Sequence, residues 1–72
     1  MYKVKPILSK ILKKRGITQT KLAEMANVPQ SAISRFDKNE QHKDTHLVSI
    51  SKALGVKIED LFEIEKKKED AE

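Results

Sequence analysis

One stretch of the chain, residues 18–39 (TQTKLAEMANVPQSAISRFDKN), limits the possible folds more than any other. It carries two short apolar sets whose members recur at spacings of three and four, the pattern of a buried helical face: Leu22, Ala23 and Ala26, then Ala32, Ile33 and Phe36. Between the sets, Asn27 can adopt a left-handed backbone conformation and Pro29 suits the first turn of a helix. Two helices joined by so short a turn cross steeply, so we expect the second helix to project outward.

The second of these helices has a polar outer face. With Ile33 and Phe36 buried, residues at steps of three or four form one ridge on the opposite side: Gln30, Ser31, Ser34, Arg35 and Lys38. The ridge contains no carboxylate, and Gln and Arg can make bidentate hydrogen bonds to adenine and guanine edges. An ordinary solvated helix face has a similar composition. The projecting position of this helix favours a nucleic-acid contact over that alternative.

The ordered set of motifs resembles the helix-turn-helix of the phage repressor and Cro family, also called Xre-type regulators. The resemblance spans about residues 4–62 and rests on Gly16-Ile17-Thr18-Gln19, Leu22-Ala23, Val28, Ile33-Ser34-Arg35 and Ser51-Lys52-Ala53-Leu54-Gly55-Val56. It implies an all-α fold, a compact bundle of four to five helices of the lambda-repressor-like DNA-binding type. It also implies that the helix over residues 30–38 enters the major groove of double-stranded DNA.

The resemblance, together with positions beside the outward helix, implies two groups of DNA-contacting residues. Those expected at base edges are Gln30, Ser31, Ser34 and Arg35. Those expected at phosphates are Thr18, Gln19, Thr20, Lys38, Asn39 and Lys43. Among the positions where the chain departs from the family, Leu12 stands where an Arg often pairs with a Glu at the position of Asp37. We therefore expect the link between the first and third helices to be apolar or absent.

Capping and stop residues predict the helix boundaries. Thr18 is the expected hydroxyl cap of the second helix, and Gly16, Asn39 and Gly55 are the expected left-handed stops of the first, third and fourth. The expected helices are at about residues 6–16, 19–26, 30–38 and 45–54, followed by a short fifth helix or turn over residues 56–62. We assign residues 1–62 to the DNA-binding domain and residues 63–72 to a charged tail that frays or prolongs the fifth helix.

Charge is distributed unevenly along the 72 residues, whose net charge is +4. Residues 1–43 contain ten Lys or Arg and three acidic residues, whereas residues 44–72 contain five and eight. A basic front half that holds the outward helix suits a partner with dense negative charge. The chain has no Cys nucleophile, no Ser-His-carboxylate arrangement and no glycine-rich phosphate loop, so we expect neither an enzyme nor a cofactor.

Metal and membrane sites are not expected either. His42 and His46 have the spacing of a helical zinc pair, but a helix boundary should fall between them and no further ligand completes a site. His42 is expected instead in the loop, near a phosphate. No apolar run approaches the roughly 20 residues of a membrane span, and no secretory signal opens the chain. We therefore expect a soluble, cytoplasmic protein.

The predicted function is transcription regulation, with the protein acting as a repressor that binds a near-palindromic operator as a homodimer. One recognition helix covers too few base pairs for selective binding, whereas a two-fold dimer places two helices about 34 Å apart, one DNA turn. The expected dimer interface is apolar and terminal: Val56, Ile58, Leu61, Phe62 and Ile64. The alternative is an antitoxin or protein-interaction module, because such proteins use the same fold to bind a partner protein.

Overall fold

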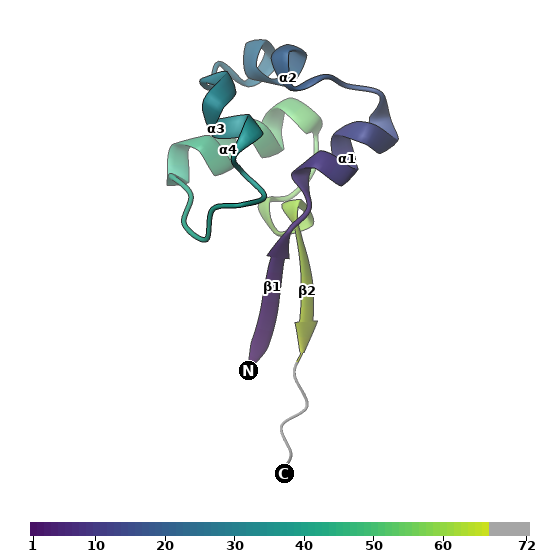
Figure 1. Ribbon diagram of the computed structural model, residues 1–72, viewed down its shortest axis with the longest axis vertical. Coiled ribbons are helices and arrows are strands. Elements are labelled where there is room, and N and C mark those ends of the chain that lie inside the picture. Colours follow the sequence, from purple (N-terminus) through teal and green to yellow (C-terminus); the bar gives the residue numbers. More distant parts are fainter. Residues whose placement is uncertain (67–72) are drawn as a thin grey trace.

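The computed structural model describes residues 1–66 as four α-helices, one 3-10 helix and two strands (Figure 1). In chain order the elements are β1 (Tyr2–Pro6), α1 (Leu8–Arg15), α2 (Gln19–Ala26), α3 (Gln30–Ser34), α4 (Asp44–Leu54), the 3-10 helix η1 (Ile58–Leu61) and β2 (Phe62–Lys66). Residues 67–72 of the expected charged tail lie outside the described residues.

Three of the predicted caps and stops are confirmed. The Thr18 hydroxyl accepts a hydrogen bond of 3.0 Å from the Lys21 amide and so caps α2. Gly16 ends α1 and Gly55 ends α4, at φ of 68° and 69°. A side chain at such a φ is strained by its own Cβ, which glycine lacks.

The helices enclose one apolar core. Its largest fully buried side chains come from the helices and the segment after α3, and none comes from β1 or β2: Leu8 from α1, Leu22 from α2, Phe36 after α3, Ile50 from α4 and Leu61 from η1. Leu12, Ile33 and Leu54 complete this cluster together with Ala26 and Val28. The core therefore holds α2 and α3 in a fixed position relative to α1 and α4.

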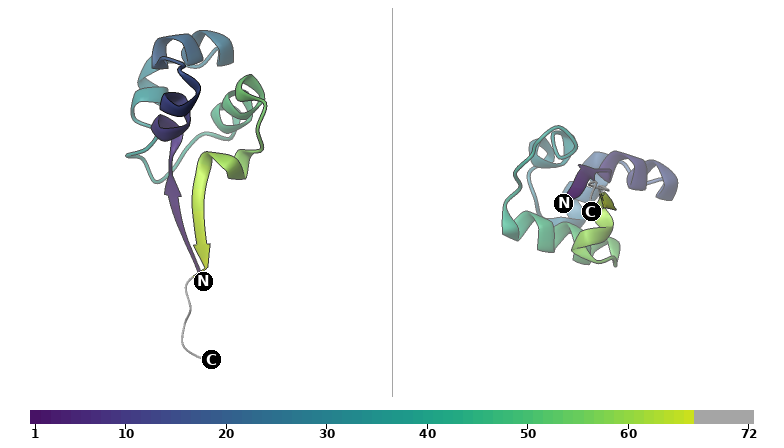
Figure 2. Two further views of the ribbon diagram at one scale, coloured as in Figure 1. Left: turned by 90° about the vertical axis from the view of Figure 1, so that its right-hand side faces the viewer. Right: turned by 90° about the horizontal axis from the view of Figure 1, so that it is seen from below.

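The expectation of an all-α fold is wrong, because β1 and β2 form a two-stranded antiparallel sheet. Its register pairs Val4 with Ile64 and Pro6 with Phe62, and the Ile7 amide donates to the Leu61 carbonyl at 3.0 Å where the strands meet the helices. The two strands lie side by side and protrude from the helical body on the side away from α2 (Figures 1 and 2). We call this pair of strands, Tyr2–Pro6 and Phe62–Lys66, the ribbon.

The ribbon replaces elements that the sequence interpretation placed at both ends. Pro6 belongs to β1 and does not begin a helix, and residues 63–66 form β2 instead of fraying or prolonging a helix. Both segments, YKVKP and FEIEK, alternate apolar and charged residues, which is the period of a strand. Each is only five residues long and its partner lies at the opposite end of the chain, so neither strand is stable until the helices bring the two together.

Candidate nucleic-acid interface

A tight turn joins α2 to α3. Asn27 ends α2 with φ 55° and ψ 48°, the left-handed conformation that the sequence predicted. Two hydrogen bonds close the turn, from the Asn27 amide to the Glu24 carbonyl at 3.3 Å and from the Val28 amide to the Ala23 carbonyl at 3.1 Å. This pair of bonds is the Schellman motif of helix ends. Because Val28 is 5% exposed and belongs to the core, the turn cannot swing freely, and the direction of α3 is fixed.

The inner side of α3 is buried and its outer side is open to solvent. Ile33 is 3% exposed, and Phe36, just beyond the helix, is 1% exposed. The four side chains predicted to contact bases, Gln30, Ser31, Ser34 and Arg35, are all exposed. The Ser34 hydroxyl donates to the Ser31 carbonyl at 3.2 Å, so Ser34 is partly engaged by its own helix. The four side chains are thus accessible on the surface, with Gln30, Ser31 and Ser34 on α3 itself and Arg35 just after it.

The third helix is shorter than predicted. It ends at Ser34 instead of Lys38, and Arg35 has φ −101° and ψ 1°, outside the usual helical range. Residues 35–38 continue as turns, and the expected left-handed stop at Asn39 is wrong, since Asn27 is the one non-glycine residue with positive φ among residues 1–66. The chain turns here because Phe36 enters the core and Asp37 reaches the start of α1.

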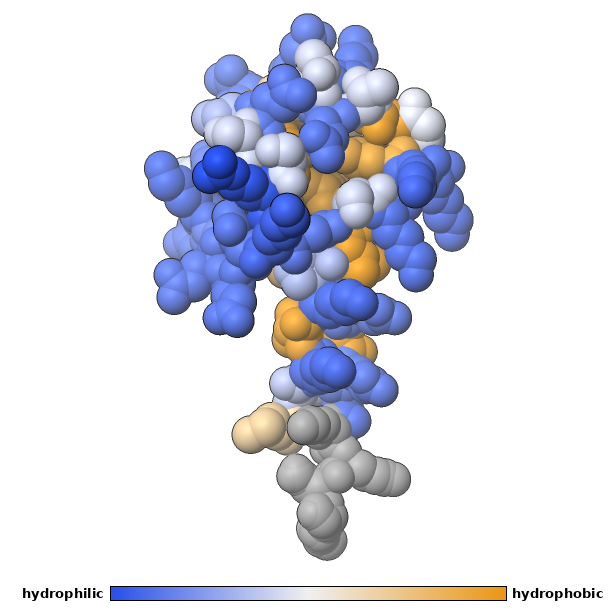
Figure 3. Space-filling view, in the orientation of Figure 1, coloured by the Kyte–Doolittle hydropathy of each residue, from blue (hydrophilic) through white to orange (hydrophobic). Residues whose placement is uncertain are grey.

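The side chains expected at phosphates come from two segments, one at the start of α2 and one between α3 and α4. Thr18 and Thr20 at the start of α2 are exposed and Gln19 is half-buried, while Lys38, Asn39 and Lys43 are exposed in the segment between α3 and α4. Hydrophilic atoms cover most of the helical body in the view of Figure 3. No acidic residue other than the inward-bonded Asp37 and the exposed Glu40 stands among residues 30–43.

Asp37 links the end of the third helical segment to α1, a contact that the sequence interpretation missed. Its carboxylate accepts hydrogen bonds from the Leu8 amide at 2.8 Å, the Ser9 amide at 3.1 Å and the Ser9 hydroxyl at 2.6 Å. The expectation of an apolar or absent link is therefore wrong, although Leu12 is buried as expected for an apolar side chain. One feature indicates that such a contact is needed. Ile7, at the N-cap of α1, has no side chain that can accept hydrogen bonds from the first amides of the helix, so a residue elsewhere must do so.

His42 has a structural role in the loop before α4. Its Nε2 atom lies 2.7 Å from the Phe36 carbonyl oxygen. Its ring centroid lies 4.1 Å from that of Phe36 and 5.8 Å from that of Phe62. The Phe36 and Phe62 ring centroids are also 5.8 Å apart, so the imidazole forms one cluster with Phe36, two residues after α3, and Phe62, the first residue of β2. His46 is half-buried on α4, which begins at Asp44, so the expected helix boundary separates the two histidines.

The residues expected at a dimer interface do not share one environment. Leu61 is 0% exposed and belongs to the core, and Val56 and Phe62 pack partly buried against that core. Ile58 and Ile64 are 39% and 50% exposed. Ile64 lies on the ribbon, which also exposes Tyr2 and Val4 from β1. Sequence reasoning missed these two residues because it placed its first element, a helix, at about residues 6–16 and expected no strand before it.

Comparison with known proteins gives one match. The model of the Cro/C1-type HTH DNA-binding domain family matches residues 7–67. No curated protein matches the chain, and no solved structure does. None of the helices within residues 1–66 is long and apolar enough to cross a membrane.

Proposed function

Because the chain belongs to the Cro/C1-type helix-turn-helix DNA-binding domain family, we propose that it is a sequence-specific transcriptional regulator that binds double-stranded DNA. In this proposal α3 enters the major groove, and the protein acts as a repressor by occupying an operator. An occupied operator is closed to other proteins that would use the same DNA, which is the physical basis of repression.

The exposed polar face of α3 is the observation that carries the proposal. Gln30 and Ser31 stand in the first turn of α3, the part of a recognition helix that comes closest to base edges. Arg35 directly follows the helix and is exposed. An Arg side chain can donate two hydrogen bonds to the O6 and N7 atoms of guanine, and Gln can pair in the same way with adenine. We assign these three residues to base contacts, with Ser34 as a further contact.

Phosphate contacts would come from two segments of the chain. Thr18, Gln19 and Thr20 lie at the start of α2, and the segment after α3 supplies the other three residues, Lys38, Asn39 and Lys43. Contacts to phosphates fix the register of a protein on the duplex without carrying sequence information. Their role in the proposal is therefore affinity and orientation, and the choice of operator belongs to α3.

The proposed working unit is a homodimer on a near-palindromic operator. A single α3 spans five residues and can contact only a few base pairs, which is too little for selection among many competing genomic sites. Two copies related by a two-fold axis read two half-sites about one DNA turn, roughly 34 Å, apart. Leu61 is completely buried and cannot contact a second copy. Of the five residues predicted at the interface, Ile58 and Ile64 are the exposed ones.

Selection of binding sites from random duplex DNA tests this function. We expect one enriched motif with two inverted half-sites about 10 base pairs apart, centre to centre. Sedimentation of the complex on that site should then give two protein chains per duplex. Absence of any enriched motif would contradict sequence-specific binding. One chain per duplex at saturation on a palindromic site would contradict the dimer. Recovery of a stoichiometric partner protein in place of DNA would favour the interaction-module hypothesis.

A further inference from the structure

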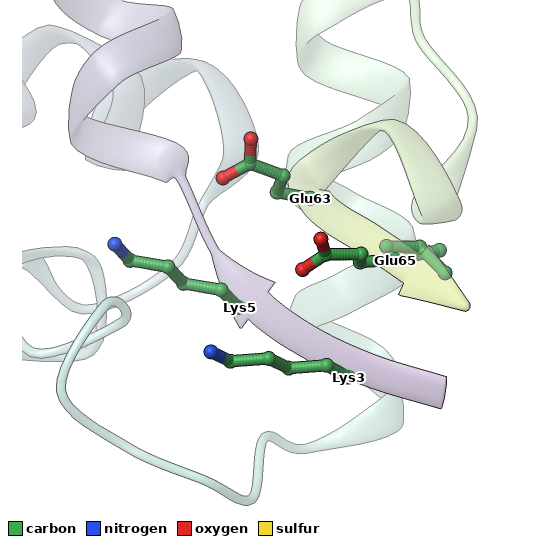
Figure 4. Close-up of a pocket in the computed structure, with 5 residues that line it drawn as sticks. Lys3, Lys5, Glu63 and Glu65 are labelled. Atoms are coloured by element: carbon green, nitrogen blue, oxygen red, sulfur yellow. The ribbon is translucent and has the colours of Figure 1, made fainter. Parts of the chain in front are cut away.

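The ribbon has one charged face and one apolar face. Residues paired across an antiparallel sheet project to the same side, so the register places Lys3 with Glu65 and Lys5 with Glu63 on one face. Figure 4 shows these four side chains on the same side of the ribbon. The other face carries the remaining cross-strand pairs: Tyr2 with Lys66, Val4 with Ile64 and Pro6 with Phe62.

The apolar face is uncovered in the single chain. Tyr2 is 62% exposed, Val4 is 55% exposed and Ile64 is 50% exposed. Figure 3 shows hydrophobic atoms at the surface of the protruding ribbon, beside the hydrophilic atoms of its charged residues. A two-stranded sheet is marginally stable in water unless its apolar face packs against something. The outer part of the ribbon, beyond the contact with the helices, thus lacks the packing that such a sheet needs.

We propose that the apolar face of the ribbon, centred on the Val4–Ile64 pair, is the docking surface for a second copy of this chain. The two ribbons pack face to face about a two-fold axis, and each covers the exposed side chains of the other. This inference rests on the dimer in the proposed function and names its interface. The interface is not the terminal cluster expected from the sequence, because it includes β1 and excludes Leu61.

The charges of the ribbon favour face packing over pairing of strand edges. If β1 paired with β1 of a second copy, Lys3 and Lys5 would stand opposite lysines of that copy. If β2 paired with its copy, Glu63 and Glu65 would stand opposite glutamates. Like charges directly opposite each other destabilise a sheet, and charged edges discourage edge-to-edge association. Face-to-face packing leaves the charges of Lys3, Lys5, Glu63 and Glu65 in water, and Lys66 lies at the outer end of the apolar face, beside Tyr2. The packing brings together a surface that complements itself, as a two-fold interface requires.

The size of the apolar face sets the strength of the dimer. Three side chains that are half-exposed or more cover on the order of a few hundred Å² per chain, less than the roughly 800 Å² per partner of a standard interface. The free protein should therefore dimerise weakly, at high concentration. An operator that binds two copies at once adds its binding free energy to the assembly and stabilises the same interface.

Two contacts join the base of the ribbon to the segment that follows α3. Asp37 binds the amides of Leu8 and Ser9 just after β1, and the rings of Phe36 and His42 pack against Phe62, the first residue of β2. The ribbon therefore has a fixed direction relative to α3. Docking of two ribbons would set the separation of the two α3 helices, and with it the spacing of the half-sites.

Single-cysteine cross-linking tests the interface, because the chain contains no native cysteine. Ile64→Cys places a thiol on the apolar face, and the matched control Glu65→Cys places one on the charged face of the same strand. With a short bis-maleimide reagent, we expect several-fold more covalent dimer from Ile64→Cys than from Glu65→Cys, both in concentrated protein without DNA and on the selected operator. Equal yields, or a higher yield from Glu65→Cys, would overturn the proposal.

The unaltered protein offers a second measurement. Tyr2 is the only tyrosine and the chain has no tryptophan, so ultraviolet fluorescence reports on the apolar face alone. Quenching of Tyr2 by acrylamide should weaken as the protein concentration rises through the dimerisation range measured by sedimentation. A dimer whose Tyr2 is quenched as strongly as in the monomer would overturn the interface. Both measurements work without DNA, so loss of operator recognition would count against the proposed function and leave this test intact.

Discussion

Arg35 is the single residue on which sequence discrimination should depend most. Its side chain is exposed directly after α3, where a guanidinium can bind a guanine edge through two hydrogen bonds. Replacing Arg35 with Ala should weaken binding to the selected operator by about 1–3 kcal/mol and binding to random DNA much less. Titrations of both duplexes at one salt concentration measure the difference.

Lys38→Ala is the matched control for this substitution. Lys38 is exposed four residues after Ser34 and is assigned to a phosphate, so its loss should weaken binding to operator and random DNA by similar factors. Equal losses on both duplexes for Arg35→Ala as well would reassign Arg35 to a phosphate contact.

Asp37 should matter for stability, although it lies only three residues after α3, the helix proposed to read DNA. Its carboxylate supplies α1 with the only side-chain acceptor found for the first amides of that helix within residues 1–66. Asp37→Ala should lower the free energy of unfolding by about 1–2 kcal/mol, the usual range for loss of a helix cap. Urea unfolding followed by circular dichroism gives the value.

A substitution at the other end of the same contact separates its parts. Ser9→Ala removes the hydroxyl that donates to Asp37 at 2.6 Å but keeps the Ser9 amide, so it should cost less than Asp37→Ala. If Asp37→Ala left stability unchanged, the three hydrogen bonds would contribute nothing to folding.

At the scale of elements, the turn between α2 and α3 sets the direction of α3, the proposed recognition helix. Asn27 has φ 55°, a conformation that costs a residue with a Cβ roughly 1 kcal/mol and glycine almost nothing. Asn tolerates this conformation better than most residues. Asn27→Ala should therefore destabilise the protein by about 1 kcal/mol, whereas Asn27→Gly should be neutral or nearly so. Thermal unfolding of the three proteins provides the comparison, and equal stabilities would show that the turn is not strained.

At the scale of the whole molecule, binding should depend steeply on salt. Thr18, Gln19, Thr20, Lys38, Asn39 and Lys43 are the proposed phosphate contacts. If about four to eight phosphates are neutralised per dimer, the logarithm of the binding constant should fall with the logarithm of salt concentration at about −0.9 per contact. Lys10→Ala is a useful comparison, because Lys10 lies on α1 and should change the slope little. A binding constant that stays flat as salt is added would contradict the electrostatic part of the proposal.

The helical part of this protein was predictable from its sequence because its signals are local. Thr18 lies within one turn of the amide that it caps, and Gly16 and Gly55 act on their own backbone. The turn at Asn27 is closed by bonds to Glu24 and Ala23, three and four residues before Asn27. Spacings of three and four mark the buried face of each helix. The ordered motifs also indicated the family, since the match to residues 7–67 covers nearly the same part of the chain.

Tertiary structure decided the features that join distant parts of the chain. β1 and β2 pair residues about sixty positions apart, and neither is stable without the other. Asp37 caps a helix that begins 29 residues before it, and α3 ends early because Phe36 and Asp37 turn toward partners that a local pattern does not reveal. The alternation of YKVKP and FEIEK was visible in the sequence, but only the folded helices bring these segments together and leave their apolar face open to water.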